Sequence, residues 1–442
     1  MNVLPMLLSA SALTFSLAFA PAAIAQSPAA DPPPRSAPKP ADTKPAEPPK
    51  ETALSDARAP NDPKRIEEAL AKVVDLLLAK QEDMEHPSAE PDTRAEWPYE
   101  GVVRVQGLVP IGYRIGGTAN TCVCLLRIPQ YAADPKRQAA VARAIAFIAQ
   151  QTANPLMSAD AWDGGYDVRG WGYTYALAFC MELKNAKAIP ADPPEMAKKV
   201  EDIIAWSLDG LKKTEIKGVG GWNYAHSPGR DSACPSSPFM TGPTLQALFE
   251  ARKNGYEVDE GMITRALDAL ERCRGSTGSF AYAAEKAQNP ERPEAIPGAV
   301  GRMLVGEVTL YLGGRSDQAR VRAAIDAFLA HWTWLDQRRA KPNTHAGPYN
   351  IAPYYFYYAH YYCAQAIELL PKGARDQDRL EYRRRLDELL FSVQLADGSW
   401  NDRVFSRTSN YGTSMAAMSF LMPTTRTPAR QAPTTHPASP PR

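Results

Sequence analysis

Apolar residues recur at helical spacing along residues 63–421, in two kinds of segment that alternate. In the first kind, exemplified by 66–77, 141–148 and 321–328, they share one face and charged residues occupy the other. That pattern is typical of an amphipathic helix with one solvated side. The second kind is apolar nearly all round, which predicts a helix buried on every side. These buried segments are Ile115–Ile128, Gly170–Leu183, Phe239–Arg252, Gly298–Leu312, Ala352–Leu370 and Tyr411–Leu421.

A short turn of the form Gly-x-aromatic joins the two helices of each pair and recurs about every 60 residues. The turns end at Tyr166, Trp222, Phe280, Tyr349 and Trp400, and a copy without glycine ends at Tyr99. A chain that reverses between packed helices needs a positive φ, which glycine tolerates. The aromatic residues are expected to fill gaps between neighbouring pairs. Six such repeats predict an all-α fold, an (α/α)6 toroid with an outer and an inner ring of helices around a central cavity.

Helix starts are marked by residues that cap the N-terminus. We predict caps at six positions: Asp62, Asp134, Asp192, Asp259, Ser316 and Asp376. Small residues also gather near the starts of the inner helices, where they allow close approach. We expect them to leave open volume at that mouth of the ring, and any site to lie there.

The two ends of the chain differ from the repeats. An apolar stretch that ends in Ala23-Ile24-Ala25 predicts a signal peptide at 1–25 and therefore export to the periplasm or the outside of the cell. Residues 26–62 are rich in Pro and Ala and predict a disordered linker, and residues 423–442 predict a disordered Pro/Thr-rich tail. The toroid is expected to span 63–422, with no stable membrane span after signal cleavage.

A formal net charge of +1 and the lack of a basic tract argue against nucleic acid as a partner. The run Arg383–Arg385 is interpreted as a solvated helix face. Six cysteines are few for this length, and most lie in apolar helical runs that predict buried thiols. Cys234 and Cys273 lie near loops, and export makes a disulfide between them a hypothesis to test.

The last repeat, Gln394-Leu395-Ala396-Asp397-Gly398-Ser399-Trp400, resembles the Q-x-x-x-G-x-W motif of the squalene–hopene cyclase and protein prenyltransferase superfamily. The resemblance covers roughly residues 63–421 and implies the same toroid. It does not extend to the catalytic motifs. The acidic D-x-D-D cluster of a protonating cyclase is missing from the sequence.

A zinc prenyltransferase would need Asp, Cys and His on inner helices. His360 and Cys363 lie one turn apart in the fifth buried segment, but the fourth supplies neither Asp nor Cys. We therefore expect no metal and no cofactor.

Candidate site residues are the few polar groups expected to reach the cavity. The loop that contains Asp163, Asp167 and Arg169 offers two carboxylates beside an arginine, with helix capping and a local ion pair as the structural alternative. Arg302 and Glu307 interrupt an apolar inner helix, so they are expected to face the cavity or to be paired, because burying an unpaired charge is costly.

The densest group of candidates follows Asn343 and His345. Tyr354, Tyr357, Tyr358 and Tyr361 share a helical face, and His360 lies among them. A buried phenol needs a hydrogen-bond partner, so a plain core would use Phe or Leu more readily. Such an aromatic wall suits an isoprenoid, a developing carbocation or a sugar stacked on the rings.

Three functions remain open. The first is an exported toroid that binds a hydrophobic or aromatic-stacking ligand without cyclase or transferase chemistry. The second is a polysaccharide lyase or glycoside hydrolase, with Asn343 and His345 neutralising a uronate, Arg302 orienting it, and Tyr354 or Tyr357 as acid and base. The third is a non-catalytic scaffold. The ligand would be a small molecule or a polysaccharide.

Overall fold

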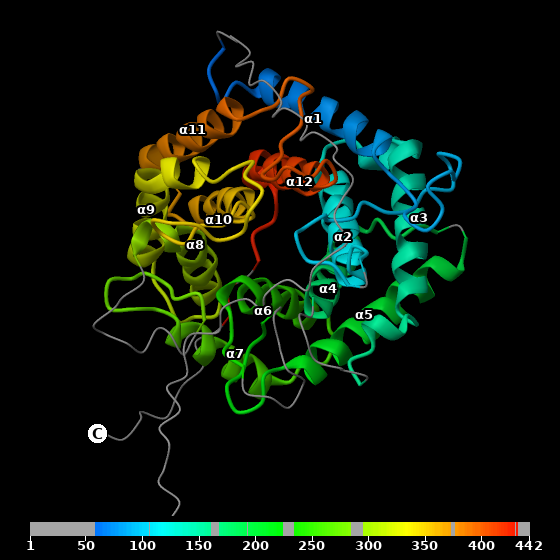
Figure 1. Cartoon of the computed structure of the whole chain (residues 1–442), viewed down its shortest axis with the longest axis horizontal. Helices are drawn as coiled ribbons and strands as arrows, with labels where there is room; N and C mark the ends of the chain where they lie inside the picture. Colours follow the sequence, from blue (N-terminus) through cyan, green and yellow to red (C-terminus); the bar gives the residue numbers. More distant parts are fainter. Residues whose placement is uncertain are drawn as a thin grey trace, which may run out of the picture. The chain divides into compact units, whose positions relative to one another are not determined.

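The computed structural model describes residues 58–105, 107–160, 168–191, 193–223, 234–283, 295–372, 376–428 and 430–431. Within these ranges the chain forms twelve α-helices in six consecutive pairs (Figure 1). The first helices of the pairs form the outer ring: α1 (Pro63–Ala79), α3 (Pro135–Gln151), α5 (Glu195–Thr214), α7 (Glu260–Arg272), α9 (Gln318–Asp336) and α11 (Asp376–Ser392). The second helices form the inner ring: α2 (Ile111–Arg127), α4 (Arg169–Ala186), α6 (Pro238–Lys253), α8 (Ile296–Leu312), α10 (Tyr355–Glu368) and α12 (Thr408–Leu421).

Each inner helix packs against the next, and α12 packs against α2 to close the ring. The outer helices bury one stripe, as α1 does with Leu70, Val73 and Leu77. Helix α12 is buried along its whole length. The predicted (α/α)6 toroid is therefore confirmed. Among the described residues, no helix is both long and apolar enough to cross a membrane.

Three of the predicted caps are confirmed. Asp62, Asp134 and Asp259 each accept hydrogen bonds from two backbone N–H groups of the first helical turn. The prediction for Ser316 was wrong by one residue: Asp317 caps α9 and accepts from the backbone of Arg320 at 2.9 Å.

The other two predicted caps differ from the structure. Helix α11 starts at Asp376 itself, so this residue lies inside the helix. Helix α5 starts at Glu195, two residues after Pro193, because Pro194 takes the N-cap position. Asp192 lies outside the described residues.

A tryptophan links the two helices of a pair in the first, third and sixth repeats. Its indole N–H donates to a carbonyl near the end of the preceding outer helix. The last carbonyl groups of a helix have few hydrogen-bond donors within the helix itself. The pairs are Trp97 with Leu77 at 2.7 Å, Trp222 with Leu211 at 2.9 Å, and Trp400 with Leu390 at 2.8 Å.

The backbone N–H of the same tryptophan donates to a threonine in the inner helix that follows. The pairs are Trp97 with Thr118 at 2.8 Å, Trp222 with Thr241 at 3.0 Å, and Trp400 with Thr413 at 3.0 Å. We call this arrangement the Trp–Thr clasp. Of the turn aromatics predicted to be wedges, Trp222, Phe280 and Trp400 are buried, Tyr349 is half-buried, and Tyr166 lies outside the described residues.

A glycine beside the threonine makes room for the clasp. A Cβ atom on Gly412 would lie 2.6 Å from the carbonyl oxygen of Trp400, and one on Gly117 would lie 2.5 Å from that of Trp97. The turn glycines Gly278 and Gly398 have positive φ, at 80° and 87°. Gly347 does not, and the peptide bond that follows it is cis to proline.

The prediction of a solvated face at Arg383–Arg385 holds for the exposed Arg385 and the partly exposed Arg384 but is wrong for Arg383, and the disulfide hypothesis is wrong. Arg383 is not part of a solvated face: its guanidinium is buried and donates to Glu368 at 2.7 Å and to the carbonyl of Ser419 at 2.9 Å. Cys234 and Cys273 form no disulfide, and both are buried free thiols. Burial raises the pKa of the Cys273 thiol to about 12.

Replacing Trp400 by Phe keeps the aromatic wedge but removes the indole donor. We expect Trp400→Phe to lower the free energy of unfolding by about 1 kcal/mol, because the carbonyl of Leu390 loses the indole donor and keeps only the longer bond from the backbone of Val393 at 3.3 Å. Urea unfolding followed by circular dichroism measures the change. Trp334→Phe is the matched control, since the Trp334 ring contacts Tyr349 edge-on and its indole has no described hydrogen bond. An equal loss in both variants would contradict the role of the clasp.

Candidate functional site

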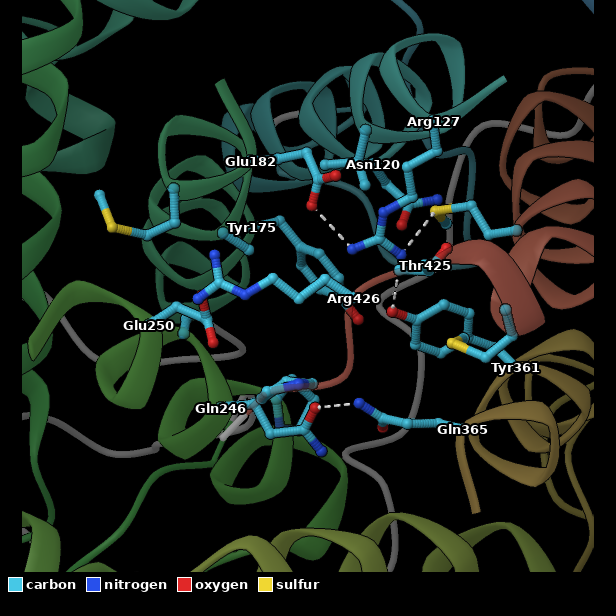
Figure 2. A pocket seen from close by; sticks show the side chains of 18 of the residues that line it. Asn120, Arg127, Tyr175, Glu182, Gln246, Glu250, Tyr361, Gln365, Thr425 and Arg426 are labelled. Atoms are coloured by element: carbon cyan, nitrogen blue, oxygen red, sulfur yellow. Dashed lines mark hydrogen bonds and ion pairs between the residues drawn. The ribbon is translucent and has the colours of Figure 1, made fainter. Parts of the chain in front are cut away.

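A pocket lies at the end of the ring where the inner helices finish (Figure 2). It is walled by the C-terminal halves of α2, α4, α6, α10 and α12 and encloses about 1030 Å³, including the part open to solvent. The segment after α12 forms a further wall through Thr425, Arg426 and Pro428.

The segment after α12 crosses from that helix toward α6 and α8 (Figure 1). Arg426 donates to Asn185 of α4 at 3.2 Å. Farther along, Arg430 donates to the carbonyl of Tyr311 at 3.2 Å, and the backbone of Gln431 donates to that of Leu312 at 2.6 Å. The pocket is thus partly covered by the chain's own C-terminal segment.

The pocket lining combines flexible apolar side chains with amides. The apolar part is made chiefly of Met181, Met415, Met418, Met422, Tyr361 and Tyr362. Methionine adapts to irregular shapes, and tyrosine offers both a ring face and a hydroxyl. The amide side chains are those of Asn120, Asn185, Gln246 and Gln365.

The charged residues of the lining form two ion pairs. Arg127 donates to Glu182 at 2.8 Å, and Arg426 lies 3.9 Å from Glu250. Burial would lower the pKa of Arg127, but Glu182 and Tyr361 beside it raise the pKa instead. Arg127 also donates to the Tyr361 hydroxyl at 3.4 Å. Arg127 therefore stays positively charged, and the negative charge of Glu182 balances it.

Four lining residues carry a buried polar atom without a hydrogen-bond partner in the described part of the chain. These atoms are Asn120 Nδ2, Arg127 Nε, the Tyr175 hydroxyl and Gln365 Oε1. Gln365 uses its Nε2 to donate to Gln246 Oε1 at 2.9 Å, which leaves its own oxygen unpaired. Buried polar groups are nearly always paired, so such atoms beside a pocket are available to bond to a ligand.

The pocket is at the opposite end of the ring from the one that the small residues led us to expect. At their end, aromatic rings occupy the described space. Tyr99 contacts Tyr113, Trp171 and Tyr411 with ring centroids 5.1–5.2 Å apart. A Cβ atom on Gly116 would lie 2.5 Å from the ring of Trp171. The small residues there make room for large aromatic rings, and not for the open volume that we expected from the sequence.

The loop candidates are only partly described. Asp163 and Asp167 lie outside the described residues. Arg169 is buried in the first turn of α4, where it donates to the carbonyl of Ser158 at 2.5 Å.

The two charged residues of α8 are paired with neighbours and not with each other. Arg302 donates to the carbonyl of Phe280 at 2.9 Å. Glu307 accepts two bonds from Arg274, at 2.8 and 2.9 Å, and one from Ser316. Glu307 is thus used within the fold, and it does not line the pocket.

The four tyrosines predicted to share a face do not line one cavity. Tyr361 lines the pocket. Tyr358 donates to the carbonyl of Phe239 at 3.2 Å, and Tyr357 is fully buried beside Gly412 of α12. Tyr354 lies at the other end of the helix. One helical face therefore meets several neighbours in succession.

His360 lies between α10 and α9 and has no nitrogen left for a ligand. Its Nδ1 donates to the carbonyl of Phe356 at 2.7 Å, and its Nε2 accepts from Trp332 at 2.9 Å. Burial lowers the pKa of His360 to about 4. Cys363 is a buried free thiol, and no group of three metal-ligating side chains occurs among the described residues.

Several other candidates do come together at the aromatic end of the ring. His345 Nε2 is 2.9 Å from the Tyr355 hydroxyl and 3.2 Å from that of Tyr354, which in turn lies 3.3 Å from the Tyr282 hydroxyl. The guanidinium of Arg302 lies 5.8 Å from the ring centroids of Tyr282 and Tyr355. We call these five residues the His345 cluster.

The side-chain Oδ1 of Asn343 accepts from Arg338 at 2.7 Å, and no described contact joins Asn343 to this cluster. The sequence indicated His345, Tyr354 and Arg302 through their unusual residue types. It missed Tyr282 and Tyr355, which look like ordinary aromatic residues of an apolar segment.

The sequence also missed Asp402, two residues after the last turn tryptophan. Its side chain is fully buried, and neither carboxylate oxygen has a partner among the described residues. Burial raises the pKa of Asp402 to about 7, although Arg403 opposes this shift. Arg403 donates to the Tyr99 hydroxyl at 3.2 Å. Nothing in the residue pattern marked this carboxylate, because its burial depends on how the last pair closes the ring.

Comparison with known proteins identifies the fold and no activity. No protein-family model matches the sequence, and a comparison with curated proteins finds no match. A D-mannose isomerase matches with a TM-score of 0.52 and 12% identity, covering 83% of this chain and 99% of that one. An unsaturated glucuronyl hydrolase from Streptococcus agalactiae matches with a TM-score of 0.48 and 12% identity, over 85% of this chain and 96% of that one.

A type II terpene cyclase from Scytonema matches with a TM-score of 0.47 and 14% identity, over 81% of this chain and 98% of that one. The class that fold and comparison define is the α/α toroid. Identities this low say nothing about the reaction, because unrelated functions share the fold. The resemblance noted in the sequence therefore holds for the toroid.

The buried carboxylate of Asp402 has a testable energetic consequence. A carboxyl whose pKa is raised on folding favours the folded state below its unfolded pKa, so this stability is lost as pH rises from about 4 to about 7. We expect Asp402→Asn to raise the free energy of unfolding at pH 7 by about 2 kcal/mol or more and to flatten its pH dependence in that window. Urea unfolding at a series of pH values measures both. Asp92→Asn, at an exposed position, is the control, and equal pH profiles for Asp402→Asn and the unmutated protein would contradict the assignment.

Proposed function

We propose that this protein is an exported α/α toroid that binds a small amphipathic ligand in the pocket at the C-terminal ends of its inner helices. The observation that carries the proposal is the unpaired polar atoms of Asn120, Arg127 and Gln365 beside a pocket lined by methionine and tyrosine. Leaving such atoms unpaired is costly, and a ligand would supply their partners. No chemistry is assigned to this pocket.

The ligand would have an apolar body and a few polar groups. Methionine side chains and the rings of Tyr361 and Tyr362 offer a surface for flat or branched apolar groups. The amides at the wall would hydrogen-bond to its polar groups and fix its orientation. Export is part of the proposal and rests on the signal-peptide pattern of residues 1–25, which lie outside the described residues.

Tyr361→Ala tests the pocket. The substitution removes a ring from the wall and a hydrogen-bond partner from Arg127, so we expect at least about tenfold weaker binding, or loss of the co-purified ligand. Native mass spectrometry of the mature protein would detect the ligand, and titration of the extracted compound would give its affinity. Tyr382→Ala in α11 is the control, since Tyr382 bonds to Asp326 on the outer ring. A bound compound that both variants retain equally would contradict this site.

A second candidate function is favoured by the His345 cluster. It places an exposed histidine beside two tyrosine hydroxyls, with an arginine nearby, as a polysaccharide lyase or glycoside hydrolase would need for acid–base work on a sugar acid. Burial raises the pKa of Tyr354, so its hydroxyl stays protonated. In this alternative the Tyr354 hydroxyl would be the proton donor and His345 the acceptor.

This alternative predicts that the protein cleaves a polyuronate and that His345→Ala lowers the rate at least about a hundredfold, because the proton acceptor is lost. Tyr354→Phe should have an effect of similar size. The ultraviolet absorbance of unsaturated products, or a reducing-sugar assay for hydrolysis, measures the rate. His331→Ala on α9 is the control. If a panel of polyuronates yields no product with the unmutated protein, the alternative fails.

A further inference from the structure

We infer that the pocket selects a ligand without net charge, whose polar groups are hydroxyl, carbonyl or amide groups rather than a carboxylate, phosphate or ammonium. This inference rests on the proposed function and adds the chemical class of the ligand. It follows from how the lining residues use their own charges (Figure 2).

The charges of the lining cancel. Its residues include two arginines and two glutamates, and each arginine has a glutamate partner within the pocket. The side chains of Arg127 and Glu182 are only 16% and 21% exposed, so their ion pair lies largely out of water. Charges in such a setting interact strongly with any further charge, because screening is weak.

An anionic ligand would meet Arg127, which already forms an ion pair with Glu182. If it took the place of Glu182 on Arg127, that carboxylate would be left in a partly buried site without its partner. The loss of one member of a buried pair is strongly destabilising. An anion that bound without displacing Glu182 would add net negative charge beside it. A cation has the same difficulty, since Glu182 and Glu250 are both paired.

A neutral ligand meets groups that are ready to bond. Asn120 Nδ2 and Arg127 Nε are unpaired donors, and Gln365 Oε1 is an unpaired acceptor. Asn120 and Gln365 are each only 4% exposed, so water reaches them poorly. A hydroxyl both donates and accepts, and a carbonyl accepts, so both suit this set. The pocket thus fits a hydroxylated or carbonyl-bearing apolar ring system.

Two dyes of matched shape test the charge preference. N-phenyl-1-naphthylamine is neutral, and 1-anilinonaphthalene-8-sulfonate has the same rings with one sulfonate. Fluorescence titration of the full mature protein should give at least about tenfold tighter binding of the neutral dye. Tyr361→Ala should weaken that binding, which places the dye in the pocket.

Glu182→Gln should change the preference. It leaves Arg127 charged and unpaired, so we expect the anionic dye to bind about tenfold more tightly and the neutral dye to change by less than about threefold. Glu250→Gln frees the more exposed Arg426 and should act in the same direction with a smaller effect, which keeps the test usable if Glu182→Gln does not fold. Glu381→Gln on α11 is the control, because it removes one of the two acidic partners of Arg384 away from the pocket and leaves Glu388.

The outcomes separate the two proposals. If the unmutated protein binds both dyes equally and Tyr361→Ala weakens both, the pocket binds ligands but the inference of neutrality is overturned. The inference is also overturned if neither Glu182→Gln nor Glu250→Gln strengthens binding of the anionic dye. If neither dye binds, or if Tyr361→Ala weakens neither, the proposed function itself fails.

Discussion

The Trp–Thr clasp fixes the geometry of three of the six helix pairs, the first, third and sixth. One buried tryptophan bonds to a carbonyl near the end of an outer helix through its indole and to a threonine of the next inner helix through its backbone. Because the turn is hydrogen-bonded to both helices in this way, each clasped pair is held in one geometry. Repetition of one geometry closes a ring. The glycine before Thr413 belongs to the same constraint, since a Cβ there would meet the carbonyl of Trp400.

The two ends of the inner ring differ because of this constraint. At the helix starts, glycines beside the clasps and elsewhere leave room for flat rings, and Tyr99, Trp171 and Tyr411 lie there in contact. At the other end the helices finish without such contacts, and methionines and amides line an open space. One end of the toroid therefore contains aromatic rings and the His345 cluster, and the other end contains the amphipathic pocket. The balanced ion pairs of Arg127 and Arg426 give the second end its chemical character.

Predictions from the sequence were most accurate where they rested on periodicity. The six pairs, three of the caps and the buried turn aromatics follow from local spacing and local hydrogen bonds. Predictions about single polar residues were less accurate. Arg383 has the spacing of a solvated face, yet it is buried because Glu368 and the end of α12 lie against it. The sequence pattern did not indicate that Asp402 and Asn120 are buried with unpaired polar atoms, since their surroundings are built from segments distant in the chain.

The sequence by itself determined the class of fold, the alternation of outer and inner helices and the identity of the wedges, because each depends on residues within one repeat. Only the tertiary structure decided which end of the ring is open. That choice depends on how side chains from five inner helices and the segment after α12 fill a shared space. It also decided that Tyr361 faces the pocket while Tyr358 and His360 face neighbouring helices, because one helical face contacts a different partner at each turn.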